Sequence, residues 1–145
     1  MKIQSLGHVV VRVTDRDRAE AFYNGVLGLP ICARLERPLK MAFFTLGNHH
    51  DFAVMEVSGD GSGKGRNAVG LDHVAFKIGD KIEQLVEAKG KLEAAGIRPD
   101  PVDHEVSKSL YFADPDGNGV ELYVDASDIW RTEPQRVAQL TPLEL

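Results

Sequence analysis

Hydrophobic and polar positions alternate with a period of two in two short segments that resemble each other. In residues 8–13 one face carries Val9, Val11 and Val13, and the opposite face carries His8, Val10 and Arg12. Residues 72–78 repeat the pattern, with His73 in the matching place. Alternation of this kind is typical of strands with one buried face. We therefore predict two strands whose apolar faces cover helices and whose histidines lie on the other side of the sheet.

The pattern that follows the first strand predicts a βαβββ order for the first half of the chain. Asp15 can cap a helix that runs to about residue 27, and Gly28 is a stop signal for that helix. Three further strands are predicted, at residues 31–35, 41–46 and 50–57, with a polar turn around Pro38.

The second half of the chain predicts the same order. Asp80 can cap a helix that ends at Gly96 in the C′ position. The later elements are predicted as a short strand at Ile97, a loop over residues 99–105, and strands at residues 109–113 and 120–124 joined by a turn at 114–118.

These elements predict one α+β domain over residues 1–145, a length that can bury a core without disulfides or metals to hold it. Glycines cluster between the two halves, where a linker is expected. The predicted parts are a first module (1–58), a Gly-rich linker (59–67), a second module (68–125) and an amphiphilic tail (126–145).

Two histidines and two glutamates share one spacing. His8 and His73 are 65 positions apart, and so are Glu56 and Glu121. Taken singly, a strand histidine is more often a hydrogen-bonded core residue, and a glutamate at a strand end is usually solvated. Carboxylates are rarely buried unless they are paired or bind a metal. The common period favours a duplicated module whose strands direct ligands at one divalent cation.

Composition narrows the classes of partner. Seventeen basic and 22 acidic residues give a net charge of −5, which argues against a nucleic-acid or anionic-membrane partner. The single Cys32 favours a reducing compartment. The sequence has no apolar run of the roughly 20 residues that a membrane span needs and no signal-peptide pattern. We expect a cytoplasmic protein.

The paired βαβββ order, the two strand-opening histidines and the segment Asp-Pro-Asp-Gly-Asn-Gly-Val-Glu-Leu at 114–122 resemble the vicinal oxygen chelate superfamily. That superfamily contains glyoxalase I, fosfomycin-resistance proteins, epimerases and extradiol dioxygenases. The resemblance covers residues 5–125. It implies two βαβββ modules that form a mixed curved sheet with helices on the outer face, and by analogy a homodimer.

Two further segments resemble the extradiol dioxygenases in particular. Asn-His-His-Asp-Phe-Ala at 48–53 is similar to a segment of that family whose second histidine is catalytic. Residues 103–115 are similar to its later His…Tyr pair, which binds the catechol. The resemblance implies three iron ligands, His8, His73 and Glu121, and three catalytic residues, His50, His104 and Tyr111.

The function that this resemblance implies is an Fe(II)-dependent ring-cleaving dioxygenase of aromatic catabolism, acting on a catechol-type diol with O₂. Two imidazoles and one carboxylate suit non-haem Fe(II) and leave positions open for substrate. Mn(II), Zn(II) and Ni(II) are alternative metals.

Two alternatives stay open. A glyoxalase I-like lyase would add Glu56 as a fourth ligand to Zn or Ni, which leaves too few open positions for a catechol and O₂ together. A drug-binding resistance protein of the same fold would need no metal and no catalysis. The presence of the His and Glu positions argues against this second alternative.

Overall fold

The computed structural model describes residues 2–59 and 69–145, so the predicted linker 59–67 lies, apart from Gly59, outside the described residues. The chain divides into two compact units by its internal contacts. The first unit is Met1–Gly70 together with Asp114–Asn118, and the second is Leu71–Ala113 together with Gly119–Leu145.

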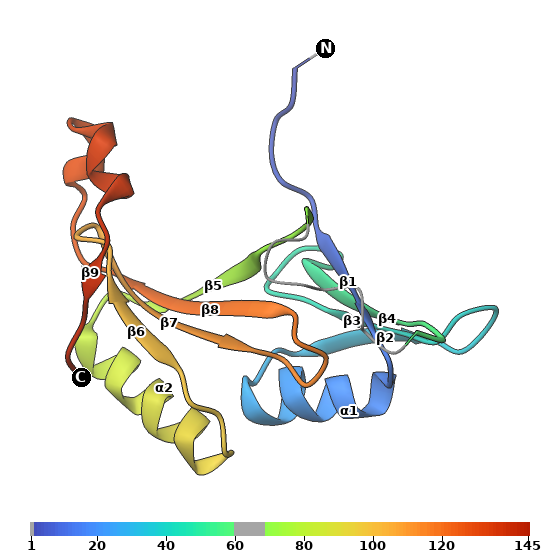
Figure 1. The fold of residues 1–145 in the computed structure, drawn as a ribbon. Helices are drawn as coiled ribbons and strands as arrows, with labels where there is room; N and C mark the ends of the chain where they lie inside the picture. The colour runs from blue at the N-terminus through green and yellow to red at the C-terminus, as the bar shows by residue number, and fades with distance from the viewer. Residues whose placement is uncertain (1, 60–68) are drawn as a thin grey trace. The chain divides into compact units, whose positions relative to one another are not determined.

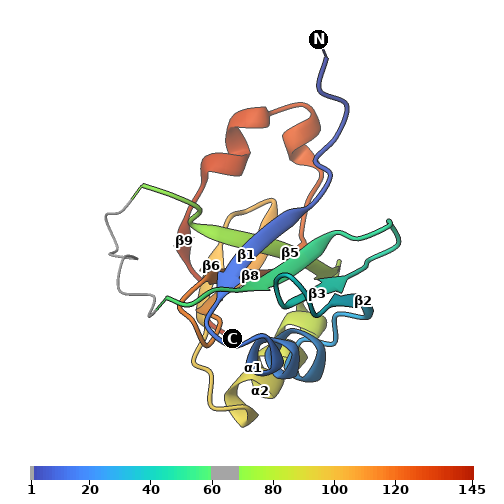
Figure 2. The ribbon, with the colours of Figure 1, turned by 90° about the vertical axis from the view of Figure 1, so that its right-hand side faces the viewer.

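The first unit contains a four-stranded mixed sheet (Figure 1). Strand β1 lies at one edge and pairs in parallel with β4, while β4, β3 and β2 follow as antiparallel neighbours (Figure 2). Its strands are β1 (Val9–Val13), β2 (Ile31–Leu35), β3 (Met41–Phe44) and β4 (Phe52–Glu56).

The second unit repeats this arrangement and adds one strand, in the order β5-β8-β7-β6-β9. Strand β5 is parallel to β8, and the other pairs are antiparallel. Its strands are β5 (His73–Gly79), β6 (Asp100–Asp103), β7 (Ser107–Ala113), β8 (Gly119–Asp125) and β9 (Thr141–Pro142). The predicted α+β class with two βαβββ modules is confirmed, as one mixed sheet in each unit.

The predicted first helix begins where expected and changes geometry halfway. Asp15 caps α1 (Arg16–Glu20) by accepting the backbone N–H of Arg18 at 3.0 Å. The helix continues as a π-helical segment, η1 (Ala21–Val26), and Gly28 follows with a positive φ of 77°. A π-segment has no simple sequence signal, so only the extent of the helix was predictable.

Aromatic side chains fill the space between this helix and its sheet. The ring centroid of Tyr23 lies 4.7 Å from that of Phe52 and 5.9 Å from that of Phe44, and all three side chains are buried. The Tyr23 hydroxyl donates to the Asp114 carboxylate at 2.9 Å, and burial raises the pKa of Tyr23. The valine face of β1 packs on this core, as its alternation predicts.

The second helix, α2 (Ile82–Ala94), corrects one prediction. Its N-cap is Lys81 and not Asp80. The Gln84 side chain reaches back instead, and its oxygen accepts the backbone N–H groups of Asp80 and Lys81, both at 3.0 Å. A Cβ on Gly79, two residues before the cap, would lie 2.0 Å from this oxygen, so glycine at this position leaves room for the Gln84 side chain to reach back. Gly96 ends the helix with a φ of 79°, as predicted.

Several strands differ from the predictions, among them β3, which ends at Phe44 and not at residue 46, and β7, which begins at Ser107 and not at residue 109. The strand predicted at residues 50–57 begins at Phe52, which leaves His50 in the preceding loop. No strand forms at Ile97, and β6 instead lies inside the predicted 99–105 loop. Pairing of β6 with β7 and β9 supplies backbone hydrogen bonds that override the weak strand propensity of its Asp and Pro residues.

The tail packs on the second unit. Two short 3₁₀ segments, η2 (Ile129–Arg131) and η3 (Pro134–Ala138), lead to β9, which pairs with the edge strand β6. Edge strands leave unpaired N–H and C=O groups, and β9 covers part of that edge. Within residues 2–59 and 69–145, every helix is too short or too polar to cross a membrane.

Candidate metal centre

Two imidazole rings of the first unit meet where β1 begins. His8 directly precedes β1, and His50 directly precedes Asp51. The backbone N–H of Val9 donates to the carbonyl of Asp51 at 3.1 Å. Because the two histidines flank this hydrogen bond, their side chains start from neighbouring points, and their ring centroids lie 4.2 Å apart.

Polar groups of the loop 45–51 fix the position of His50. The Leu46 backbone N–H donates to the Asp51 carboxylate, and the Thr45 hydroxyl donates to the Asn48 carbonyl, each at 2.6 Å. These two hydrogen bonds join residues three and five positions apart within the loop. They hold the backbone before β4 and so set the direction in which the His50 side chain leaves it.

The surroundings of His50 favour its neutral form. Its ring centroid lies 5.3 Å from that of Phe43, and its side chain is half-buried. Burial lowers the pKa of His50, and the nearby His8 and His49 lower it further. A neutral imidazole can accept a proton, which is what a general base must do.

The second unit contains an imidazole and a carboxylate in direct contact. His73 Nε2 and Glu121 Oε2 lie 3.0 Å apart, and Glu121 is buried. Metal–ligand distances near 2.1 Å place adjacent ligand atoms of one ion about 3 Å apart. This pair therefore already has the spacing of two ligands on one divalent cation, and the donor set fits such an ion.

Outer hydrogen bonds orient both groups. His73 Nδ1 donates to the Asp72 carboxylate at 2.7 Å, and Nε2 faces the Glu121 carboxylate, where a metal ion would take the place of the proton between the two groups. The hydroxyl of Ser109, itself fully buried, donates to Glu121 Oε1 at 2.6 Å, which leaves Oε2 on the side of His73. Partners of this kind are typical of metal ligands, whose orientation and basicity they set.

Gly119 allows β5 to come close enough to β8 for His73 to contact Glu121. Gly119 opens β8 opposite His73, and a Cβ there would lie 2.1 Å from the backbone oxygen of Asp72. A side chain would force β5 away from β8 at the point where His73 reaches Glu121. The glycine of the Asp-Pro-Asp-Gly-Asn-Gly motif is thus a steric requirement of the site.

His104 and Tyr111 form a second polar pair in this unit. The Gln139 carbonyl lies 2.9 Å from His104 Nδ1, and since a carbonyl only accepts, Nδ1 must carry the proton. His104 Nε2 is then an acceptor, and the Tyr111 hydroxyl donates to it at 2.9 Å. Burial, followed by the charge of Glu121, raises the pKa of Tyr111 to about 12, so the phenol keeps its proton at neutral pH.

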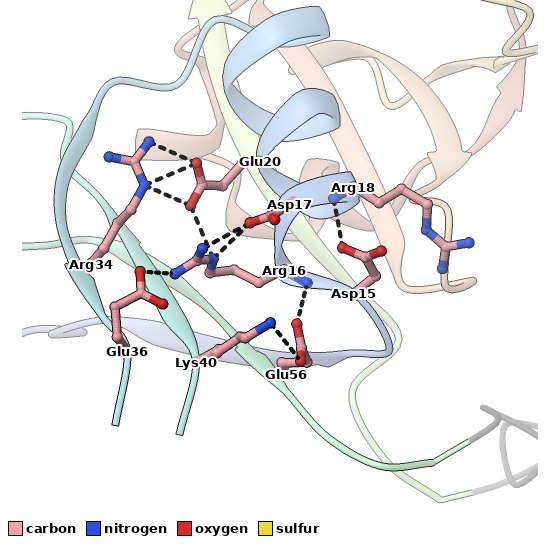
Figure 3. Close-up of polar contacts among 9 residues, drawn as sticks. All are labelled: Asp15, Arg16, Asp17, Arg18, Glu20, Arg34, Glu36, Lys40 and Glu56. Atoms are coloured by element: carbon pink, nitrogen blue, oxygen red, sulfur yellow. Dashed lines mark hydrogen bonds and ion pairs between the residues drawn. The ribbon is translucent and has the colours of Figure 1, made fainter. Parts of the chain in front are cut away.

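Glu56 is engaged elsewhere in the first unit. One of its oxygens accepts the Arg16 backbone N–H at 3.0 Å, and the other pairs with Lys40 Nζ at 3.6 Å (Figure 3). An acidic side chain at this position is favourable because it meets the positive end of the helix dipole. The Arg16 guanidinium beside it is buried and pairs with Asp17, Glu20 and Glu36.

Strand register corrects the predicted repeat. In β8, Glu121 lies opposite the second residue after His73. In β4 the corresponding place, opposite the second residue after His8, belongs to Ala53. The predicted equivalence of Glu56 and Glu121 is therefore wrong, because the segments between the paired strands differ in length by three residues. Glu56 lies at the other end of β1 from His8 and serves the start of α1.

The structure thus brings the predicted residues together in two groups. His8 and His50 meet in the first unit. The second unit gathers His73, Glu121, His104 and Tyr111. Coordination of one ion by His8 together with His73 and Glu121 stays a prediction.

Several supporting residues were not predicted from the sequence. Asp72 directly precedes His73, and Ser109 stands two positions before Tyr111 on the same strand face, so both had a positional signal. Gln139 had none, because its contribution is a backbone carbonyl delivered by the tail.

Comparison with known proteins agrees with this architecture. A model of the Glyoxalase/Bleomycin resistance protein/Dioxygenase superfamily matches residues 5–122. The chain belongs to this superfamily. The resemblance noted in the sequence is confirmed, and it establishes the fold while leaving the reaction open.

Members of the superfamily with different reactions are similar to this chain. Biphenyl-2,3-diol 1,2-dioxygenase 3 of Rhodococcus globerulus is 36% identical over 125 residues, which are 83% of this chain and 63% of that protein. A probable lactoylglutathione lyase of Synechocystis is 27% identical over 124 residues, 83% of this chain and 95% of that protein. The chain therefore spans less than two thirds of the dioxygenase and nearly all of the lyase.

Among solved structures, a mutant of the fosfomycin resistance protein FosX from Listeria monocytogenes, complexed with Mn(II), has a TM-score of 0.68 at 22% identity. The match covers 91% of this chain and 99% of that one. At this level of identity the likeness shows the fold alone.

Replacement of Glu121 and of Glu56 by glutamine separates the roles of these two carboxylates. We expect Glu121→Gln to lower Fe(II) affinity by more than about 10-fold, because it alters the predicted ligand that Ser109 and His73 contact. Glu56→Gln should leave Fe(II) affinity unchanged. It should weaken the contacts of residue 56 with the start of α1 and with Lys40, a pair worth about 0–1 kcal/mol. Anaerobic Fe(II) titration against a competing chelator measures both. Equal losses in the two variants would restore Glu56 as a ligand.

The tautomer of His104 gives a second prediction. We expect ¹⁵N NMR of the metal-free protein to show the proton of the neutral ring on Nδ1, because the Gln139 carbonyl accepts it. Tyr111→Phe should leave this tautomer in place, since Tyr111 donates to the other nitrogen. A ring protonated on Nε2 in either protein contradicts the assignment.

Proposed function

We propose that the chain is an Fe(II)-dependent extradiol dioxygenase that cleaves the ring of a catechol-type aromatic diol with O₂. The observation that carries the proposal is the His104–Tyr111 pair in the same unit as the His73–Glu121 contact. The 36% identity to a biphenyl-diol dioxygenase supports the same reaction class.

Three residues, His8, His73 and Glu121, would hold the metal. When bound, Fe(II) supplies open coordination positions at which the diol and O₂ come together. The buried Glu121 carboxylate contributes the negative charge of the set. Mn(II) is the alternative metal that fits the same donors.

Tyr111 and His104 would orient the diol. Tyr111 keeps its proton at neutral pH and can donate a hydrogen bond to a diol oxygen. His104 Nε2 is an acceptor because Gln139 holds the proton on Nδ1, so it can take the proton that a diol hydroxyl gives up on binding. The Tyr111 hydroxyl now donates to His104 Nε2. A bound diol would replace this hydrogen bond and use the same donor and the same acceptor with its two neighbouring oxygens.

His50 would be the acid–base catalyst. It approaches His8 in the first unit, has a half-buried ring and lies beside Phe43. The lowered pKa of His50 favours a neutral ring, which can accept a proton from the substrate and pass it on. We also propose a homodimer and a cytoplasmic location, as the family resemblance and the composition imply.

The lyase alternative rests on a different ligand set. A four-ligand centre would need a carboxylate from the first unit, and the register gives Ala53 in the place that corresponds to Glu121. Glu56 is bound at the start of α1 instead. This observation favours the three-ligand dioxygenase over the lyase.

Activity tests the proposal directly. Protein loaded anaerobically with Fe(II) should consume O₂ with catechol, a 3-substituted catechol or 2,3-dihydroxybiphenyl, and develop a yellow ring-fission absorbance. His50→Phe should lower kcat by about 10²–10⁴-fold and retain its iron. Turnover of the methylglyoxal–glutathione hemithioacetal alone would replace the proposal with the lyase, and loss of iron in His50→Phe would make His50 a ligand.

A further inference from the structure

Three imidazoles of the first unit lie within reach of one another. His8, His49 and His50 each offer a ring nitrogen, and these nitrogens all lie within 4.8 Å of one another. The family resemblance explains His8 and His50 and gives no role to His49. The cluster as a set of three is a separate feature of this chain.

Loop geometry places two consecutive histidines on the same side. In a regular strand, neighbouring side chains point to opposite faces. His49 and His50 lie in the loop before β4, where this rule does not apply, and their ring centroids are 4.6 Å apart with the planes at 85°. The His8 ring lies 6.3 Å from that of His49 and 4.2 Å from that of His50, so it completes a triangle.

We propose that His8, His49 and His50 bind a Zn(II) ion in the first unit, at a site that shares His8 with the proposed iron centre and takes its other two ligands from the loop before β4. The ion takes three imidazole nitrogens and keeps one open position for water. This set is one of the arrangements that Zn(II) adopts with protein ligands.

Distances allow the site to close. Tetrahedral coordination with bonds of about 2.0–2.1 Å places the nitrogens about 3.4 Å apart. The ring nitrogens now lie within 4.8 Å of one another, so the most distant pair must approach by up to about 1.4 Å. His8 and His49 are exposed, so side-chain rotation supplies this movement without a change in the core.

Charge and ligand type select the metal. The three ligands are neutral, and the nearby Asp51 carboxylate accepts the Leu46 backbone N–H, which stabilises the loop. Imidazole ligands without a carboxylate suit borderline cations, and affinity for such sites rises from Fe(II) to the later metals of the series. Zn(II) is favoured because it imposes no geometry of its own.

A polar neighbour can orient His49 for binding. Asn48 Oδ1 lies 3.2 Å from His49 Nδ1. In the tautomer in which Nδ1 donates to this oxygen, the lone pair of the ring lies on Nε2. Ligand histidines commonly donate their second nitrogen to an oxygen in this way.

The consequence for the enzyme rests on the proposed function. His8 and His50 cannot serve both metals, so Zn(II) in the three-histidine site excludes Fe(II) from a centre that needs His8. Zn(II) binding itself is independent of any dioxygenase activity and can be tested without it.

The experiment measures Zn(II) binding where the iron centre is already impaired. In the full chain carrying Glu121→Gln, competition with a chromophoric chelator should show one bound Zn(II) per chain. Adding His49→Asn should lower that affinity by more than about 10-fold. Adding His104→Asn, the same change in the second unit, should leave it unchanged, and circular dichroism confirms that each variant is folded.

A second experiment measures how much iron the protein takes up in the presence of Zn(II). Equimolar Zn(II) should block Fe(II) uptake by the unaltered chain more strongly than uptake by His49→Asn, in which Zn(II) can compete only at the proposed iron ligands. The proposal is overturned if His49→Asn binds Zn(II) as tightly as its parent, or if Glu121→Gln alone abolishes Zn(II) binding, which would place Zn(II) at the iron ligands. Absence of ring cleavage with these binding results intact would reject the dioxygenase and leave the zinc site standing.

Discussion

A carboxylate buried in a sheet needs a partner for each oxygen, and Glu121 finds its partners in Ser109 and His73. An unpaired buried charge would cost several kcal/mol, so the sheet around β8 must provide both contacts wherever this residue is kept. The Ser109 hydroxyl fixes one oxygen, and the other is left facing an imidazole nitrogen. That second contact is where a metal ion can replace a proton, and the rest of the proposed chemistry depends on it.

Parallel pairing of the first and last strand in each module is what makes such contacts possible. It sets His73 opposite Gly119 in the second unit, and in the first it sets His8 beside the loop that carries His50. The two modules use the same pairing for different purposes. One gathers a carboxylate, an imidazole and a phenol, whereas the other gathers three imidazoles and uses its glutamate to support a helix.

Much of this was predictable from the sequence, because strand alternation and turn residues are local signals. The βαβββ order, the Asp15 cap and the facing of Glu121 toward His73 follow from such signals. The role of Glu56 did not, since an equal spacing of 65 residues says nothing about strand register, which the structure sets by the pairing of β1 with β4. The Gln139 carbonyl was hidden because a backbone group carries no positional signature, and the Gln84 cap was missed because Lys81 is not one of the usual capping residues.

The central proposal is that His8, His73 and Glu121 would hold one iron. Anomalous diffraction at the iron edge, from crystals of the anaerobically Fe(II)-loaded protein, tests it most directly. The account predicts one iron with a nitrogen of each histidine and an oxygen of Glu121 at about 2.0–2.2 Å, and with Glu56 remote. An iron held by His73 and Glu121 without His8, or one bound by Glu56, would contradict it.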